Sequence, residues 1–286
     1  MKVLITGSQG MLGSSLCPVM AKEHSVSPLS HQDLDVTDTN KAIQMITELK
    51  PDIVIHLASN TNVDECEIHP DLAYKVNALG TWNVAAACQR SDAIMIYIST
   101  DGVFDGTKGE PYTEFDSTNP LSFYSKSKLA GESYVKSILT KYYIVRAGWM
   151  FGGRERDKKF VGKILELATK NSEIRAVNDK IGSPIYTYDL SVAISKLIRI
   201  PLYGTYHIAN KGFCSRYEFA KKIVEYAGLD INVKPVGSSA FKLAAPRPLM
   251  TPLRNYCLEL LDKDDLRHWE DALKDYIETL RRNGYL

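Results

Sequence analysis

The sequence predicts an α/β fold, in which helices cover both faces of a parallel β-sheet, with a smaller C-terminal domain. In the first half of the chain, short apolar segments alternate with longer segments of helical periodicity, as in successive βαβ units. A glycine-rich segment directly follows the first apolar segment, and the pattern becomes less regular after about residue 152. These observations favour a Rossmann-like doubly wound parallel sheet followed by a second region.

The elements are expected in the following order. Apolar segments predict strands at about residues 2–6, 25–29, 52–58, 93–99 and 142–147. Helical spacing predicts connecting helices at 12–20, 41–49, 72–90 (with Gly80 inside it) and 124–140. Beyond them we expect a helix at 188–202, a strand at 204–209 and a closing amphipathic helix at 269–282. The first domain would comprise residues 1–153 and about 187–228, and the second about 154–186 and 229–286.

Composition excludes several classes of protein. No apolar segment is long enough to span a membrane, and a net charge of +1 argues against a protein whose main partner is nucleic acid. The five cysteines are an odd number without a close pair, so neither a disulfide framework nor a zinc site is indicated. We expect a cytoplasmic protein with no membrane or nucleic-acid partner.

Three glycines point to a dinucleotide. Gly7-x-x-Gly10-x-x-Gly13 lies between the first strand and the first helix, where the backbone can turn sharply and present helix N–H groups to a pyrophosphate. The alternative is an ordinary tight turn. The spacing differs from the G-x-G-x-x-G of many dehydrogenases and resembles that of the short-chain dehydrogenases.

The cofactor is expected to be NADPH or NADH. The second strand ends at Leu29-Ser30-His31, which offers neither a carboxylate to repel a 2′-phosphate nor an arginine to bind one. Asp35-Val36 resembles the adenine-contacting turn of extended short-chain dehydrogenases; alternatively, Asp35 or Asp38 caps the next helix. The predicted cofactor contacts are Gly7, Gly10, Met11, Leu12, Gly13, Ser30, Asp35, Val36, Leu57, Ala58, Ser59, Tyr124 and Lys128.

A Tyr-x-x-x-Lys spacing places both side chains on one face of a helix, and the chain contains it twice, at Tyr124/Lys128 and Tyr217/Lys221. Only the first copy has a suitable context. Thr100 precedes Tyr124 and ends an apolar strand, at the sheet edge where α/β proteins bind ligands. We therefore interpret Tyr217/Lys221 as one turn of an amphipathic helix.

This constellation suits reduction of a carbonyl. Hydride addition leaves an oxyanion, which Tyr124 would protonate, while the Lys128 ammonium would lower the pKa of the phenol and bind the nicotinamide ribose. Thr100 would position and polarise the carbonyl. Asn77 resembles the superfamily's asparagine that orders a proton-relay water; the alternative is an ordinary polar helix residue.

Further segments resemble one family, the dTDP-4-dehydrorhamnose reductases. They are Val54-Ile55-His56-Leu57-Ala58, Asn62-Val63-Asp64, Ser99-Thr100-Asp101-x-Val103-Phe104-Asp105-Gly106, Tyr124-x-x-x-Lys128-x-x-Gly131-Glu132, Arg146-x-x-Trp149-x-x-Gly152, Ile181-Gly182-Ser183-Pro184, Gly204-Thr205-Tyr206-His207 and Arg247-Pro248. The resemblance implies reduction of the 4-keto group of a nucleotide-linked 6-deoxyhexulose, giving dTDP-L-rhamnose for cell-surface polysaccharide. It implies Thr100, Tyr124 and Lys128 as the catalytic trio and Val63 and Trp149 as sugar contacts.

The sequence also departs from the family. The family's tyrosine in Ser-Thr-Asp-Tyr-Val-Phe is Gly102 here, and we expect this loss to open the sugar pocket beside Gly102 and Val103. Ser15 holds the position of a glutamate with which some members dimerise around magnesium, so no metal and a monomer or weak homodimer are expected.

Basic residues offer candidates for a nucleotide diphosphate. Arg247 stands between Pro246 and Pro248 and is a rigidly held candidate. A second candidate is the loop at the start of the second domain, although a solvated run of charges is the alternative there; it carries Arg154, Arg156, Lys158 and Lys159.

Two other functions stay open at this point. The family also resembles the regulatory β subunit of methionine adenosyltransferase, which keeps the fold without catalysis. Extended short-chain enzymes further include nucleotide-sugar epimerases and dehydratases.

Overall fold

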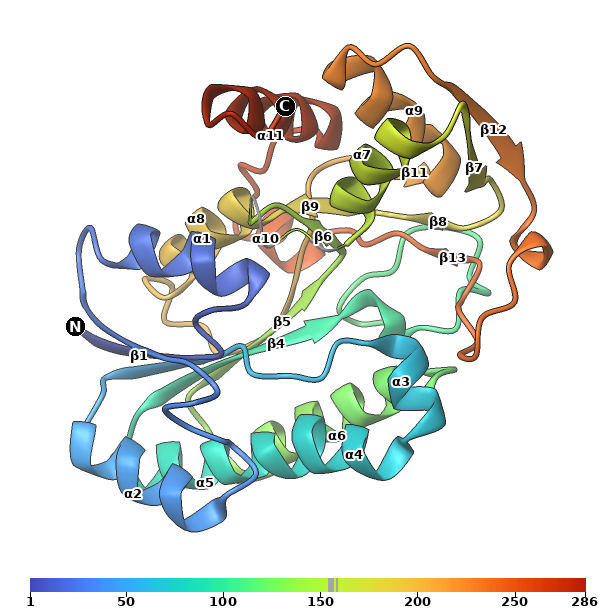
Figure 1. Cartoon of the computed structure of the whole chain (residues 1–286). Helices are drawn as coiled ribbons and strands as arrows, with labels where there is room; N and C mark the ends of the chain where they lie inside the picture. The colour runs from blue at the N-terminus through green and yellow to red at the C-terminus, as the bar shows by residue number, and fades with distance from the viewer. Residues whose placement is uncertain (154–156, 158) are drawn as a thin grey trace.

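The computed structural model describes residues 1–153, 157 and 159–286, and its centre is a parallel sheet of six strands (Figure 1). Their order is β10-β5-β4-β3-β1-β2, and every neighbouring pair is parallel. The strands are β1 (Lys2–Thr6), β2 (Ser25–Leu29), β3 (Ile53–His56), β4 (Ile94–Thr100), β5 (Tyr142–Ala147) and β10 (Gly204–Ile208). The strand order reverses between β1 and β3, and such switch points are where doubly wound sheets bind ligands. The predicted fold class is confirmed.

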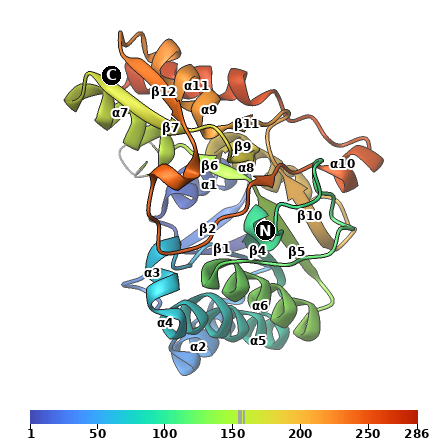
Figure 2. The ribbon, with the colours of Figure 1, turned by 90° about the vertical axis from the view of Figure 1, so that its right-hand side faces the viewer.

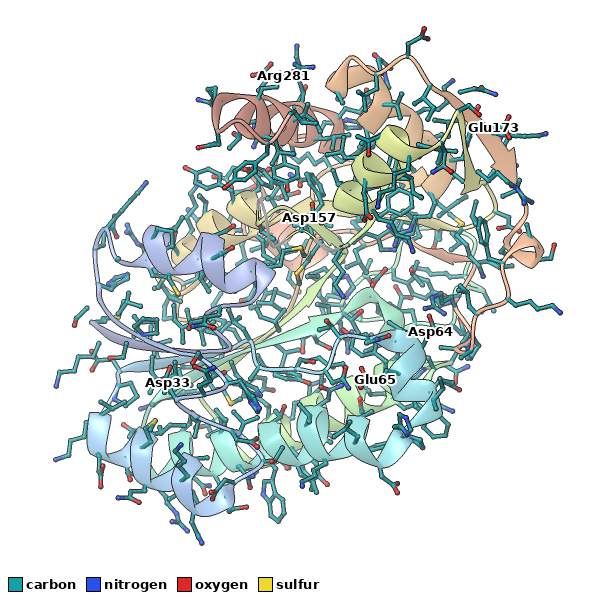
Figure 3. All side chains as sticks on the ribbon, in the orientation of Figure 1. Asp33, Asp64, Glu65, Asp157, Glu173 and Arg281 are labelled. Carbon is teal, nitrogen blue, oxygen red and sulfur yellow. The ribbon has the colours of Figure 1, made fainter. Side chains whose placement is uncertain are left out.

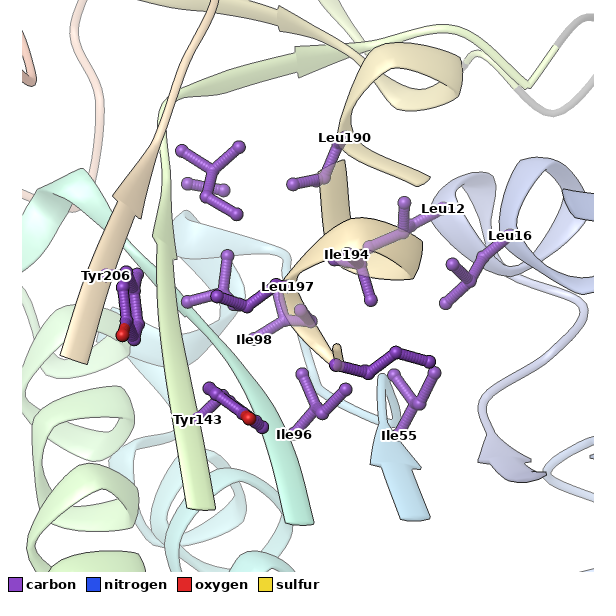
Figure 4. Close-up of a cluster of buried hydrophobic side chains, with 14 of the residues drawn as sticks. Leu12, Leu16, Ile55, Ile96, Ile98, Tyr143, Leu190, Ile194, Leu197 and Tyr206 are labelled. Atoms are coloured by element: carbon purple, nitrogen blue, oxygen red, sulfur yellow. The ribbon is translucent and has the colours of Figure 1, made fainter. Parts of the chain in front are cut away.

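Helices cover both faces of the sheet because successive strand residues point to opposite sides. On one face, Ile55 and Ile96 pack with residues of α1 (Met11–Met20) and α8 (Thr187–Leu197), as Figure 4 shows. On the other face, Val54 and Met95 pack with residues of α2 (Thr39–Leu49), α5 (Gly80–Ser91) and α6 (Phe123–Ile138). The two cores hold the carboxyl ends of β1, β3 and β4 side by side.

The helix expected at 72–90 is interrupted. It consists of α4 (Pro70–Tyr74), a π-helical turn (Lys75–Leu79) and α5, with Gly80 inside the helical run as expected. A Cβ on Gly80 would lie 2.8 Å from Val36 Cγ2, so the helix can approach the turn after β2 only without a side chain there. Single π turns occur mostly at functional sites, and this one contains Asn77.

A second core lies beyond the sheet (Figures 1 and 2). Its largest buried side chains include Phe151, Phe219 and Tyr276. The helices that contribute to this core are α7 (Phe160–Lys170), α9 (Arg216–Ala227) and α11 (Trp269–Arg282), whereas α10 (Tyr256–Leu260) packs on β10 with Leu258 in the core of the sheet. Its short strands pair as β6 (Trp149–Phe151) with β9 (Pro184–Tyr186), β7 (Glu173–Val177) with β12 (Asn232–Val236), and β8 (Ile181–Gly182) with β11 (Cys214–Ser215) and β13 (Met250–Thr251).

The division into two domains stays a prediction, and two helices, α9 and α10, pack differently from it. We expected residues 187–228 in the first domain, and α8 and β10 do pack around the parallel sheet. The apolar face of α9, with Phe219, Ala220 and Ile223, instead joins α7 and α11 in the second core. Among the described residues, no helix is both long and apolar enough to cross a membrane.

Candidate active site

The turn between β1 and α1 contains three glycines, and two of them have a clear steric reason to be glycine. Gly7 has φ +65°, and a Cβ there would lie 2.7 Å from the backbone N of Ala58. A Cβ on Gly13 would lie 2.2 Å from the backbone O of Ser8. The chain therefore passes closely over the end of β3, as the predicted dinucleotide motif requires.

The start of α1 fits a pyrophosphate. Gly10 precedes the helix, no described side chain caps it, and its first turn carries no acidic residue. The backbone N–H groups at Met11 and Leu12 and the positive end of the helix dipole are therefore available to an anion. Residues 57–59 follow β3 beside this turn, so the structure brings these predicted cofactor contacts together.

The end of β2 carries a carboxylate that the sequence analysis missed. The Oγ and backbone N of Ser30 donate hydrogen bonds to Asp33 Oδ2 over 2.6 and 2.8 Å. These bonds lower the pKa of Asp33. The Ser-x-x-Asp spacing, which is typical of a side-chain turn, is the sequence signal that could have revealed Asp33. A cofactor ribose at this strand end would therefore meet Ser30 together with Asp33.

Asp35 and Asp38 have separate roles. Asp38 caps α2, because its side chain accepts a hydrogen bond from the backbone N of Lys41. Asp35 instead accepts bonds from the backbone N and Oγ1 of Thr37, both 2.9 Å long, and these bonds lower its pKa. The capping alternative thus holds for Asp38, and Asp35 fixes the turn that presents Val36.

Thr100 and Tyr124 meet at the carboxyl edge of the sheet, as predicted. Thr100 is the last residue of β4, and Tyr124 lies in the first turn of α6, which Ser122 caps. The Thr100 side chain lies close enough to Tyr124 to influence its pKa. Thr100 Oγ1 also accepts from the backbone N of Gly102 and donates to Asp101, each over 3.1 Å. The strand end therefore holds the threonine in one orientation against the tyrosine.

The pKa of Tyr124 is raised rather than lowered. Burial is the largest cause, followed by the negative charge of Asp101, while the nearby Thr100 side chain opposes them. We expected Lys128 to lower this pKa, and in this structure it does not: its Nζ lies 4.1 Å from the centroid of the Tyr97 ring. A protonated phenol is nevertheless the form that a proton donor needs.

Lys128 is buried on the inner face of α6, with an exposed fraction of 4%. Burial lowers the pKa of its ammonium to about 7, and the charge of Glu132 opposes this shift. Removal from water disfavours the charged form of a lysine, so the group is poised to gain or lose a proton near neutral pH. A site that lowers a lysine pKa in this way is a candidate functional site.

Asn77 ties the cofactor side of the site to α6. Its Oδ1 accepts from Ser59 Oγ and from the backbone N of Asn60, each over 2.8 Å. Its Nδ2 donates to the backbone O of Asn60 and to Ser127 Oγ, each over 3.0 Å. The side chain is therefore fully engaged by protein. Its backbone O also accepts a hydrogen bond from Thr81 Oγ1 over 2.7 Å, and the predicted relay role stays a prediction.

A buried ion pair supports the carboxyl edge of the sheet at Thr100 and Tyr124, hereafter the catalytic edge. The sequence analysis gave this pair no role. Glu132 lies one turn after Lys128 and accepts bonds from Arg146 Nη2 and Nε, over 2.8 and 3.0 Å. Ser99 Oγ donates to the same carboxylate over 2.6 Å. These contacts join β4, β5 and α6 directly beneath Thr100 and Lys128. Glu132 and Arg146 are neighbours only in the folded chain, so sequence spacing alone could not reveal the ion pair.

The predicted sugar contacts lie along the same edge. Val63 begins α3 (Val63–Ile68) and is partly buried. Trp149 follows β5, whose last residue pairs with Thr100. A Cβ on Gly182 would lie 2.3 Å from the Trp149 ring, so the indole is backed closely by β8. On the Trp149 ring lies the guanidinium of Arg216, which the sequence analysis did not consider.

Position 102 is less open than expected. A Cβ on Gly102 would lie 2.5 Å from Ser125 Oγ, so Ser125 takes part of the space left by the missing tyrosine side chain. The side chain of Val103 differs from its predicted role more strongly. It is fully buried in a cluster with Phe104 and Tyr112, because the 3-10 turn after β4 directs it inward. A sugar contact through this side chain is therefore not supported.

Arg247 is already paired. Its Nη1 and Nη2 donate to the two carboxylate oxygens of Asp64 on α3, over 3.0 and 2.8 Å, and Figure 3 labels that aspartate. This pair joins α3 to the segment before β13 and lowers the pKa of Asp64. Lys159 Nζ donates to the backbone O and Oγ1 of Thr61. The other basic candidates of that loop, Arg154, Arg156 and Lys158, lie outside the described residues.

The expectation that the protein binds no metal stays a prediction. Ser15 Oγ shares a 2.8 Å hydrogen bond with Thr187 Oγ1. In residues 1–153, 157 and 159–286, no group of three or more His, Cys, Asp or Glu side chains could hold a metal ion.

Comparison with known proteins agrees with this geometry. The family model for the RmlD substrate binding domain matches residues 1–282. The spore coat polysaccharide biosynthesis protein SpsK of Bacillus subtilis is 36% identical over 97% of this chain and 97% of its own length.

Two solved structures are similar over nearly the whole chain. A dTDP-4-dehydrorhamnose reductase from Clostridium acetobutylicum is 43% identical, with a TM-score of 0.95 over 98% of this chain and 100% of that one. The dTDP-4-dehydrorhamnose reductase from Bacillus anthracis, in complex with NADP, is 42% identical, with a TM-score of 0.94 over 97% and 99%. The resemblance noted in the sequence is thus confirmed: the chain belongs to the RmlD substrate binding domain family, the family of the dTDP-4-dehydrorhamnose reductases.

Proposed function

We propose that this protein reduces the 4-keto group of a nucleotide-linked 6-deoxyhexulose, converting dTDP-4-dehydrorhamnose to dTDP-L-rhamnose with NADPH or NADH. The observation that carries the proposal is the meeting of Thr100 and Tyr124 at the carboxyl end of β4, beside the glycine turn of β1 and α1. The reductase relatives and the NADP in one of their structures support it. The product would serve cell-surface polysaccharide synthesis in the cytoplasm.

The residues divide the work between them. When bound, the reduced nicotinamide supplies the hydride. The glycine turn and the start of α1 bind the pyrophosphate, and Lys128 binds the nicotinamide ribose. Thr100 Oγ1, which accepts a hydrogen bond from the backbone N of Gly102, turns its one hydroxyl proton from Asp101 to the substrate carbonyl and orients it. Tyr124, kept protonated by its raised pKa, gives its proton to the forming alkoxide.

Fewer of the predicted substrate contacts remain in the proposal. Val63 and Trp149 flank the catalytic edge and remain the proposed sugar contacts, and Gly102 leaves the backbone close to the sugar. A monomer or weak homodimer is proposed, with no nucleic-acid partner. No further observation favours the regulatory-subunit or epimerase functions, since the solved relatives over 40% identical are named reductases.

The second Tyr-x-x-x-Lys copy supplies a matched control for the test. With dTDP-4-dehydrorhamnose and NADPH, we expect loss of the reduced-nicotinamide absorbance in proportion to product formed. Tyr124→Phe should lower turnover by about 10²- to 10⁴-fold, because the proton donor is lost. Tyr217→Phe, on α9, should leave turnover unchanged. Equal rates in Tyr124→Phe and wild type would end the proposal, and product without net cofactor oxidation would favour an epimerase.

A further inference from the structure

Arg216 lies beside the proposed active site, and its cation makes no ion pair with any described acidic side chain. It is the first residue of α9, and its guanidinium carbon lies 3.4 Å from the centroid of the Trp149 ring and 4.8 Å from that of Phe160. Within the part of the chain that the structure describes, no side chain forms an ion pair or hydrogen bond with this guanidinium. The two rings therefore fix its plane while its N–H donors stay available.

Three features of the fold disfavour a positive charge at this position. Burial lowers the pKa of Arg216 to about 10, and the charge of Arg247 lowers it further. The residue also stands at the N-terminal end of a helix, where the dipole favours anions and disfavours cations. The negative charge of Asp101 opposes these effects, but it makes no ion pair with the guanidinium, so a bound anion would gain from the free N–H donors of Arg216.

The position is close to the catalytic edge. Trp149 follows β5, and the last residue of β5 is in register with Thr100. Arg216 also interacts electrostatically with Asp101, the residue that holds Thr100. A ligand that reaches both Thr100 and Trp149 would therefore lie beside Arg216.

Three other cations of the described part of this region are already engaged. Arg247 makes a two-pronged pair with Asp64, and Lys180 Nζ donates to the backbone O of Arg247 over 2.6 Å. Lys159 donates to Thr61. Arg216 thus has free donors in a planar fork, the geometry that matches two phosphate oxygens.

We propose that Arg216, held between Trp149 and Phe160, binds the diphosphate of a nucleoside-diphosphate sugar. The Arg247–Asp64 pair then has a different task, which is to join α3 to the second half of the chain. This inference rests on the proposed function for the identity of the sugar, and it requires only a nucleoside diphosphate for the site itself.

The test measures nucleotide affinity in the presence of saturating NADP⁺. The full-length wild type, Arg216→Met and the control Arg175→Met would be titrated calorimetrically with dTDP, UDP, GDP and thymidine. Arg175 suits the control because it too lies over an aromatic ring, Phe241, but away from the site. We expect Arg216→Met to weaken the preferred diphosphate by about 10- to 100-fold, with no change for thymidine or NADP⁺. Arg175→Met should match wild type.

A second readout separates binding from folding. Removing a partly buried charge that makes no ion pair should leave the thermal midpoint of ligand-free Arg216→Met equal to or above that of wild type. Diphosphate affinity within twofold of wild type in the folded variant would overturn the inference. So would an equal loss for thymidine, or a wild type that binds none of the three diphosphates. If wild type binds a diphosphate through Arg216 but reduces no keto sugar, the proposed function fails and this inference stands.

Discussion

Gly102 and Ser125 share one small space beside the catalytic pair. A Cβ at position 102 would lie 2.5 Å from Ser125 Oγ but 3.6 Å from Ser125 Cβ, which is an ordinary contact. Ser125 is buried, and its Oγ accepts a hydrogen bond from Ser122. The identity of residue 102 is therefore coupled to the side chain at 125, one residue after Tyr124.

This coupling predicts a compensating pair of substitutions. Gly102→Ala should lower the free energy of unfolding by about 1–3 kcal/mol, because the added methyl overpacks the space. In Gly102→Ala/Ser125→Ala the clash is removed, and most of that loss should be recovered. Urea unfolding of both single variants and the double variant measures the coupling. Strictly additive losses would show that the two residues do not share this space.

Sequence reasoning at the residue scale succeeded where the signal was local. The glycines, Thr100 and Tyr124 were found because a strand end, a turn and a helical spacing lie within short segments. Arg216 and the Glu132–Arg146 pair were missed because their partners come from other elements, and nothing in their own segments marks those contacts.

At the scale of elements, the π turn at Lys75–Leu79 is the feature that most directly shapes the site. Its one extra residue turns Asn77 inward, where four side-chain hydrogen bonds join the loop after β3 to α6. The helical periodicity of 72–90 predicted the helix but not its interruption. Tertiary bonds made by Asn77 stabilise the turn, and they have no counterpart in local propensity.

Asn77→Ala should therefore affect cofactor binding as well as stability. We expect a loss of about 2–4 kcal/mol in the free energy of unfolding, because buried partners such as Ser127 lose their bonds. NADPH affinity should fall in parallel, since residues 57–60 lose their anchor. Gln89→Ala is the control: its amide bonds the backbone O of Ile138 on the exposed side. Cofactor affinity as strong in Asn77→Ala as in Gln89→Ala would contradict this role.

At the scale of the whole molecule, two histidines link folding to pH. His56 and His207 are fully buried in β3 and β10, and burial lowers the pKa of each to about 3. An unfolded histidine takes up a proton near pH 6.5. Between these values the unfolded state binds more protons than the folded state, so stability is present above pH 6.5 and is lost as the pH falls.

His207→Gln should weaken this acid sensitivity. Each histidine adds up to about 1.4 kcal/mol per pH unit to the slope below pH 6.5, and the variant removes one such contribution. Burial raises the pKa of Asp101, Glu114 and Asp157, which acts in the opposite direction in both proteins and cancels in the comparison. Urea unfolding from pH 6.5 to 5 measures the slopes, with the exposed His31→Gln as control. Parallel curves for wild type and His207→Gln would contradict the argument.

The overall architecture was the most predictable level. Alternating apolar and helical segments fixed the parallel sheet, including the late return of the chain as β10, because each segment carries its own periodicity. The second half was predicted less well. Several of its strands have only two or three residues, and α9 shows an apolar face without indicating which core receives it.

Direct hydride transfer to the sugar is the claim on which the whole account depends. The most direct test supplies dTDP-4-dehydrorhamnose with NADPH deuterated at the transferable position of the nicotinamide ring, followed by NMR of the isolated product. The account predicts a single deuterium at C4 of the sugar for each cofactor oxidised. Product that carries no deuterium at C4, or that forms without cofactor oxidation, would contradict it.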